Sequence, residues 1–173
     1  MGPHYLASRP LRYLPGGQGV DSAEQMRVLF ALNTLEAGDL PRGDGDNSSP
    51  ELQALQARMD LLLLLVGQLS QQLGQGTRPA AVPVQIAAEA IEWQAAEALA
   101  EGEGVLELHL HEACPQPLRL GGTLQASGTE GRYRFCPQLP DPDAADAWER
   151  HIFRHHRRAV ARKQQSAVDP PSS

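Results

Sequence analysis

Residues 105–111, VLELHLH, alternate apolar and polar side chains, and this pattern decides the fold class of the second half of the chain. Successive side chains of a β-strand point to opposite faces, so the alternation predicts a strand with one buried face. Shorter alternating runs occur at 82–86, 118–120 and 133–135. Short strands at intervals of roughly ten residues favour a small antiparallel barrel, because closure removes exposed sheet edges.

A helical pattern in residues 50–73 predicts assembly with other copies of the chain. Its apolar residues follow one another at alternating steps of three and four: Leu52, Leu55, Met59, Leu62, Val66, Leu69 and Leu73. This spacing is typical of the a and d positions of a coiled coil, and we name these residues the heptad seam. Ser49 and Pro50 suit the start of the helix, and Gly74 suits its end. An ordinary amphipathic helix packed on its own domain is the alternative.

The run LLLLLV at 61–66 adds two constraints. It is far shorter than the ~20 apolar residues that a membrane-spanning helix needs, so no membrane insertion is expected. Several of its leucines lie off the heptad seam, which widens the apolar face beyond that of a two-stranded coil. We therefore predict a parallel coiled coil within a multi-stranded bundle.

The composition of the chain excludes several classes of function. The 173 residues carry a formal net charge of -6 at pH 7, which gives no general attraction to nucleic acid. The first 20 residues lack the apolar core of a signal peptide, so we expect a cytoplasmic protein. Cys114 and Cys136 are expected to be reduced thiols. No glycine-rich phosphate loop, nucleophile elbow or supported carboxylate pair is visible in the sequence, so neither catalysis nor a cofactor is expected.

The chain divides into three regions on these patterns, and the fold class is α+β. Residues 1–48 comprise an arm over the Pro- and Gly-containing residues 1–20, a helix over 21–37 and a linker. Residues 49–76 form the oligomerisation helix, and residues 77–173 form the barrel with a C-terminal helix. The helix at 21–37 opens on a capping box and is expected to cover the heptad helix.

The last helix, about 142–164, begins with acidic residues and ends with basic ones, which suits the helix dipole. Three of its residues are expected to dock on the barrel or the helical layer: Trp148, Ile152 and Phe153. Three others are expected to be mainly solvated: Arg154, Arg157 and Arg158.

A histidine pair on the same helix is the candidate metal site. His151 and His155 are four residues apart, so they share one face of the helix and could hold a metal together with a third ligand. His156, Cys114 and His111 are the candidates for that ligand. A surface or interface role is nevertheless the expectation for the pair.

Three stretches share the layout of a known family. QIAAEAIEW at 85–93 stands where that family has a D/N-x-S-x-x-G turn followed by an apolar residue and an aromatic one. VLELHL follows a Glu-Gly turn, like the family's third strand, and WERHIFRHHRRAVARKQQ at 148–165 resembles its closing helix. Residues 84–165 thus resemble a PilZ domain, which implies a six-stranded antiparallel barrel and a link to cyclic di-GMP. The added heptad helix resembles the atypical tetrameric PilZ proteins of xanthomonads, which implies a homotetramer.

The resemblance implies a ligand site, and this sequence departs from it. The three positions of the turn motif are occupied by Gln85, Ala87 and Ala90. The family's R-x-x-x-R arm, whose guanidinium groups pair with phosphate, is missing just before the barrel. Only Arg78 is near, and Arg9 and Arg12 lie far upstream. We therefore expect no cyclic di-GMP in the usual site, and the alternative is a receptor with a non-standard site.

The function that follows is that of a non-catalytic oligomeric adaptor. The resemblance implies a role in bacterial signalling tied to motility or virulence, through contacts with a signalling protein that the sequence does not identify. A metal-dependent enzyme centred on the histidines is the remaining hypothesis.

Overall fold

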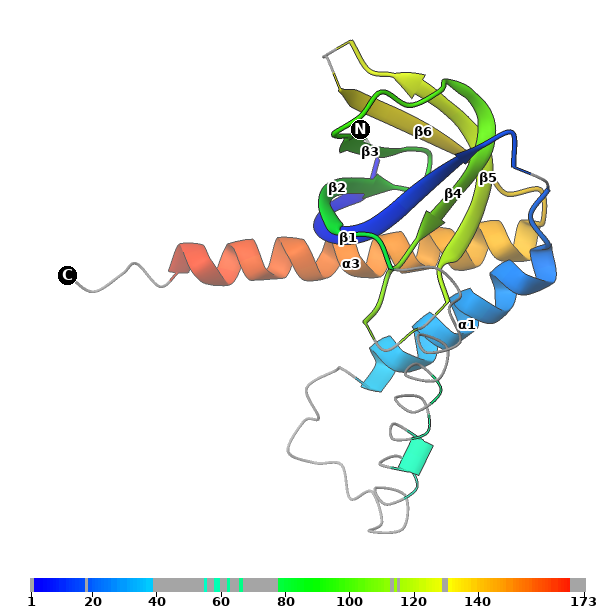
Figure 1. Ribbon diagram of the computed structural model, residues 1–173. Helices are drawn as coiled ribbons and strands as arrows, with labels where there is room; N and C mark the ends of the chain where they lie inside the picture. The colour runs from blue at the N-terminus through cyan, green and yellow to red at the C-terminus, as the bar shows by residue number, and fades with distance from the viewer. Residues whose placement is uncertain are drawn as a thin grey trace.

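The computed structural model describes residues 2–17, 19–38, 55, 58–59, 62, 66, 78–112, 114, 116–128 and 131–168. Within these residues the elements are β1 (His4–Pro15), α1 (Ser22–Gly38), β2 (Ala81–Ala87), β3 (Ile91–Gln94), β4 (Gly102–Leu108), β5 (Leu118–Ala126), β6 (Arg132–Gln138) and α3 (Pro142–Val168). The strands close into an antiparallel barrel in the order β1-β2-β3-β6-β5-β4 (Figure 1). The prediction of an α+β fold built on a six-stranded antiparallel barrel is confirmed for this part of the chain.

The first strand corrects the prediction of an arm over residues 1–20. Residues 4–10 pair with β2 and residues 11–15 pair with β4, so β1 joins two strands that would otherwise be open edges. Pro10 stands at the change of partner, a position that tolerates a residue without an N–H group. Proline inside a sequence pattern argues against a strand, which is why this segment looks like an arm in the sequence. The region 77–173 supplies the other strands.

Buried residues of the alternating strands fill the barrel. The alternation is clearest in β5, where Leu118, Leu120 and Leu124 are fully buried. The neighbouring strands add Ile86, Ile91, Leu106, Leu108 and Phe135 to the same core. Gly122 of β5 lies where an added Cβ would collide with the carbonyl oxygen of Cys136 on β6. Glycine is therefore required there, because the two strands approach closely.

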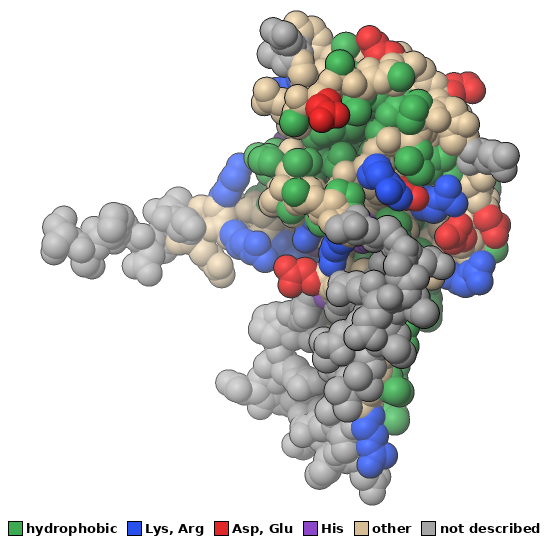
Figure 2. All heavy atoms as spheres, viewed as in Figure 1, with side chains coloured by type: hydrophobic (Ala, Val, Ile, Leu, Met, Phe, Trp, Pro, Cys, Tyr) green, Lys and Arg blue, Asp and Glu red, His purple; other side chains and the backbone are tan. Residues whose placement is uncertain are grey.

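Two helices pack beneath the barrel in the view of Figure 1. Helix α3 runs below β1, and α1 contacts both α3 and β5. The shared core includes Val28, Leu29 and Leu32 from α1, together with Trp148 and Ile152 from α3. Figure 2 shows Lys and Arg side chains along the outer surface of α3.

The docking prediction for α3 is confirmed for Trp148 and Ile152, which are buried, but it is wrong for Phe153, which is 52% exposed. Residues of an α-helix are about 100° apart, so Phe153 lies about 140° around the helix from Trp148. The buried face of α3 therefore cannot include both residues.

The heptad helix is described at residues 55, 58–59, 62 and 66, which are all helical. The seam positions Leu52, Leu69 and Leu73 lie outside the described residues, as does the expected contact of α1 with this helix. In the part of the chain that the structure describes, no helix is long and apolar enough to cross a membrane.

Candidate functional site

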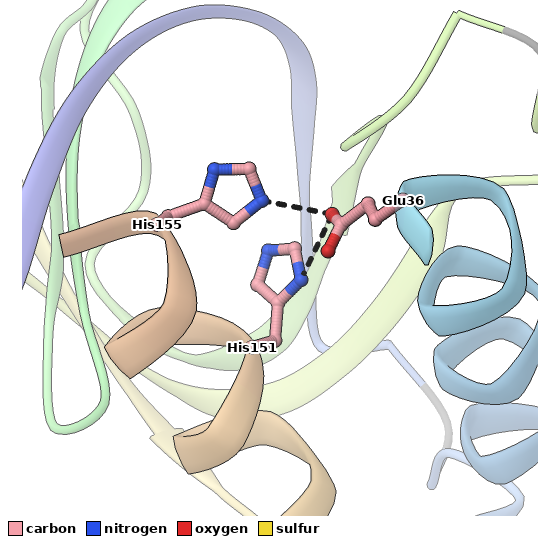
Figure 3. Close-up of side chains that lie close together, drawn as sticks. All are labelled: Glu36, His151 and His155. Atoms are coloured by element: carbon pink, nitrogen blue, oxygen red, sulfur yellow. Dashed lines mark hydrogen bonds and ion pairs between the residues drawn. The ribbon is translucent and has the colours of Figure 1, made fainter. Parts of the chain in front are cut away.

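The end of α1 meets the middle of α3 at three side chains, Glu36, His151 and His155 (Figure 3). We name them the Glu-His-His cluster. Both histidines face one carboxylate oxygen: Glu36 Oε1 lies 2.8 Å from His155 Nε2 and 3.2 Å from His151 Nδ1. The three candidate ligand atoms all lie within 4.8 Å of one another. Glu36 is 2% exposed and His151 is 1% exposed, so the cluster is closed to bulk water except at His155.

Side chains around the Glu-His-His cluster hold it in place. Arg154 Nη1 lies 3.0 Å from the second carboxylate oxygen, Oε2, and Arg158 donates to the backbone carbonyl of Glu36 at 3.2 Å. Tyr5 Oη of β1 lies 3.1 Å from His151 Nε2, and the Tyr5 ring stacks on His155 with centroids 4.6 Å apart. The cluster therefore ties α1, α3 and β1 together. Arg154 and Arg158 are not mainly solvated, which corrects the prediction for these two residues.

Burial and charge fix the protonation states. Burial alone would raise the pKa of Glu36, but the interactions with His151 and His155 outweigh it and hold that pKa well below its usual value. Burial lowers the pKa of His151 and raises the pKa of Tyr5. At neutral pH the cluster is thus a carboxylate that faces a neutral imidazole of His151, with the neutral phenol of Tyr5 behind that ring.

The structure places both predicted histidines on one face, where α3 meets the end of α1; His151 is buried and His155 is partly exposed. The third group is Glu36, which was not among the candidates from the sequence. Two of the three candidate third ligands make contacts elsewhere: His156 Nδ1 lies 2.7 Å from the carbonyl oxygen of His4, and Cys114 Sγ lies 3.5 Å from that of Gln116. One signal for Glu36 was available, because it continues the apolar stripe of α1 one turn after Leu32.

The turn motif lies between β2 and β3, on the α3 side of the barrel. The N–H of Ala87 donates to the carbonyl oxygen of Ala90 at 2.9 Å, which closes the turn. Trp148 Nε1 on α3 donates to the carbonyl oxygen of Ala88 at 3.1 Å, so α3 covers part of this turn. Gln85 stands in the middle of β2, paired with β1 and β3.

The three arginines singled out from the sequence do not gather at this turn. Arg12 pairs with Glu107 across β1 and β4 at 2.7 Å. Arg78 reaches the backbone carbonyl oxygen of His111 at 3.4 Å. Arg9 lies on β1 opposite Val82. These contacts are thus made with other parts of the barrel.

A groove between the turn and α3 brings other arginines to the same place. It is lined by Ala88 of the turn and, on α3, by Phe153, by four basic residues (Arg150, Arg154, Arg157 and Arg158) and by two acidic residues (Asp146 and Glu149). The guanidinium of Arg157 lies 5.9 Å from the centre of the Phe153 ring, a cation–π distance. We name this surface the α3 groove. It combines positive charge with an exposed aromatic face.

The heptad seam leaves apolar side chains exposed in the single chain. Its described members are Leu55, Met59, Leu62 and Val66, and their exposed fractions are 55%, 49%, 61% and 51%. Large apolar residues at helical spacing are seldom left this exposed unless they meet another surface.

Comparison with known proteins identifies related chains. A family model described as "Atypical PilZ domain, cyclic di-GMP receptor" matches residues 26–165. The chain is also similar to a solved structure of a pathogenic protein from Xanthomonas campestris, described as a new tetrameric PilZ domain self-assembled via an unusual helical bundle. The two share 26% sequence identity over 92% of this chain and 91% of that one, with a TM-score of 0.75. No curated protein matches the chain.

Proposed function

The chain belongs to the atypical PilZ domain family, described as cyclic di-GMP receptors, and from this premise we propose that it is a non-catalytic tetrameric adaptor in bacterial signalling. It acts in the cytoplasm through contacts with another signalling protein, in a process such as motility or virulence. The observation that carries the proposal is the exposed heptad seam, which has no partner surface among the described residues of the single chain.

The seam supports assembly through a bundle of helices. Four described side chains, each about half exposed, lie at steps of four, three and four on helical residues. Identical chains with such a seam can pair in parallel and in register, and each Å² of apolar surface they bury contributes about 25 cal/mol. The similar protein from Xanthomonas campestris is a tetramer that self-assembles via a helical bundle, which favours four chains here.

The oligomeric state tests this part of the proposal. Light scattering after gel filtration at micromolar concentration should give a mass near four times 18.7 kDa. Leu62→Asp places a charge in the seam and should reduce the mass, because a buried unpaired carboxylate is costly. Arg58→Gln, on the same helix but off the seam, is the matched control and should stay tetrameric. A wild-type monomer would contradict the proposal.

The proposal has a second part: cyclic di-GMP does not occupy the family's usual site. The turn between β2 and β3 supports it. Ala87 lacks the hydroxyl of the family's Ser, and Ala90 adds a methyl group where close approach is wanted. Each charge-assisted hydrogen bond that is missing is worth roughly 1.5–3 kcal/mol, and 1.4 kcal/mol is tenfold in affinity. The loss of several such bonds would weaken a micromolar site beyond millimolar.

The α3 groove favours a second candidate, a cyclic di-GMP receptor with a non-standard site. The nucleotide offers phosphates to guanidinium groups and a guanine face to Phe153 or Arg157. Calorimetry at physiological salt separates the candidates. Saturable binding tighter than about 10 µM would favour the receptor, provided that Arg157→Ala abolishes it. Arg132→Ala, which removes an exposed arginine on β6 paired with Glu92, is the control. Absence of binding supports the adaptor.

A further inference from the structure

We propose that the Glu-His-His cluster is a divalent metal site that holds Zn²⁺ through Glu36 Oε1, His151 Nδ1 and His155 Nε2. One carboxylate and two imidazoles form a ligand set that suits zinc. The ligands come from two elements far apart in the sequence, and the metal would join the end of α1 to α3. This inference goes beyond the adaptor function and does not depend on it.

The distances fit a metal after small side-chain movements. Zinc bonds of about 2.0–2.2 Å place tetrahedral ligand atoms roughly 3.3 Å apart. Glu36 Oε1 is already 2.8 Å and 3.2 Å from the two histidine nitrogens. The two nitrogens lie no more than 4.8 Å apart. Rotations that move each ring by on the order of 1 Å would complete the arrangement.

His151 provides the second observation, because its buried Nδ1 faces the Glu36 carboxylate at 3.2 Å without a well-formed hydrogen bond. A neutral imidazole has one N–H and one lone pair. In one tautomer Nε2 carries the hydrogen and donates it to Tyr5 Oη, so the lone pair of Nδ1 faces the carboxylate; in the other, the N–H of Nδ1 points at Glu36 Oε1 and Nε2 accepts from the Tyr5 hydroxyl. A cation between Nδ1 and Oε1 would select the first tautomer and bond to both atoms.

The surrounding residues resemble the supporting groups of a metal site. A histidine ligand usually donates its other N–H to a neighbouring oxygen, and Tyr5 Oη is 3.1 Å from His151 Nε2. Arg154 holds Oε2 of Glu36 and leaves Oε1 directed at the histidines. Trp148 stacks on His151, with ring centroids 5.7 Å apart. These contacts hold the ligands close to the arrangement that a metal needs.

A metal could enter from the side of His155, whose side chain is 18% exposed. This residue lines a groove with Tyr5, Arg9 and Arg158. The fourth coordination position would open toward this groove and take water or a ligand from solution. Because the ligands come from α1 and α3, we assign the metal to fastening these two helices together.

The test uses the full-length chain without a histidine tag, stripped with a chelator and re-equilibrated with Zn²⁺ or Mg²⁺. Elemental analysis should find about one zinc per chain, and zinc but not Mg²⁺ should raise the melting temperature, since Mg²⁺ prefers oxygen ligands. Co²⁺ in the same site should show the visible absorption of a tetrahedral complex.

His155→Ala and Glu36→Gln should weaken zinc binding by more than about 100-fold, since each removes a direct ligand. His156→Ala, next to the site on the same helix, is the matched control and should bind like the wild type. Circular dichroism will show whether each variant is folded. A folded wild type that retains no zinc after equilibration would overturn the proposal. Equal affinity of His155→Ala and the wild type would also overturn it, since the zinc would then lie elsewhere.

Discussion

Replacement of Trp148 by alanine tests how α3 is fastened to the barrel. Trp148 is 1% exposed and fills the space between α3 and the turn at residues 87–90. Its indole N–H donates to the carbonyl oxygen of Ala88 at 3.1 Å, and its ring stacks on His151. The substitution therefore removes a large buried apolar group, one hydrogen bond and one wall of the Glu-His-His cluster.

The expected loss follows from these contacts. Truncation of a buried Trp to Ala costs about 3–5 kcal/mol in the free energy of unfolding, and the unpaired carbonyl of Ala88 favours the upper end. For a chain of this size, 1 kcal/mol lowers the melting temperature by about 2–4 °C. Trp148→Ala should therefore melt roughly 6–20 °C below the wild type. The assay is thermal unfolding by circular dichroism at fixed chain concentration, because assembly affects the midpoint.

Phe153→Ala is the matched control, since Phe153 is an aromatic residue of the same helix but is 52% exposed. Its melting temperature should change by only about 1–2 °C, as expected for a surface substitution. Trp148→Phe separates the two contributions, because it keeps most of the volume and removes the hydrogen bond. Equal melting temperatures for Trp148→Ala and the wild type would refute the docking of α3 on this turn.

Two further predictions concern the barrel. Gly122→Ala should lower the melting temperature or prevent folding, because the new methyl group collides with the carbonyl oxygen of Cys136, whereas Gly121→Ala, where a Cβ has room, should be tolerated. Burial and the charges of Arg78 and Arg12 lower the pKa of His109, against a smaller opposing effect of Glu107. The folded chain then binds fewer protons than the unfolded chain below about pH 6.5, so stability should fall as the pH falls, and His109→Gln should reduce this dependence in chemical denaturation.

The strands could be predicted where one face of each is buried. β2, β4, β5 and β6 alternate in sequence because their inward side chains fill the barrel. β1 has no such signal. Its burial does not alternate regularly, it contains prolines, and its partners in β2 and β4 lie far along the chain. A strand whose pairing is set entirely by distant segments leaves little trace in its own residues.

In the sequence, Glu36 and the two histidines are visible only as polar residues on the apolar faces of two separate helices. The buried stripe of α3 is centred near Trp148. Three other residues lie within about 60° of it around the helix: His151, Ile152 and His155. Both histidines are therefore on the buried stripe. On α1, Glu36 lies within about 40° of Leu29 and Leu32. Charged and polar groups on apolar stripes must find partners, because an unpaired buried charge is costly. A carboxylate on one stripe and two imidazoles on the other satisfy each other, but only the packing of α1 on α3 shows that they meet.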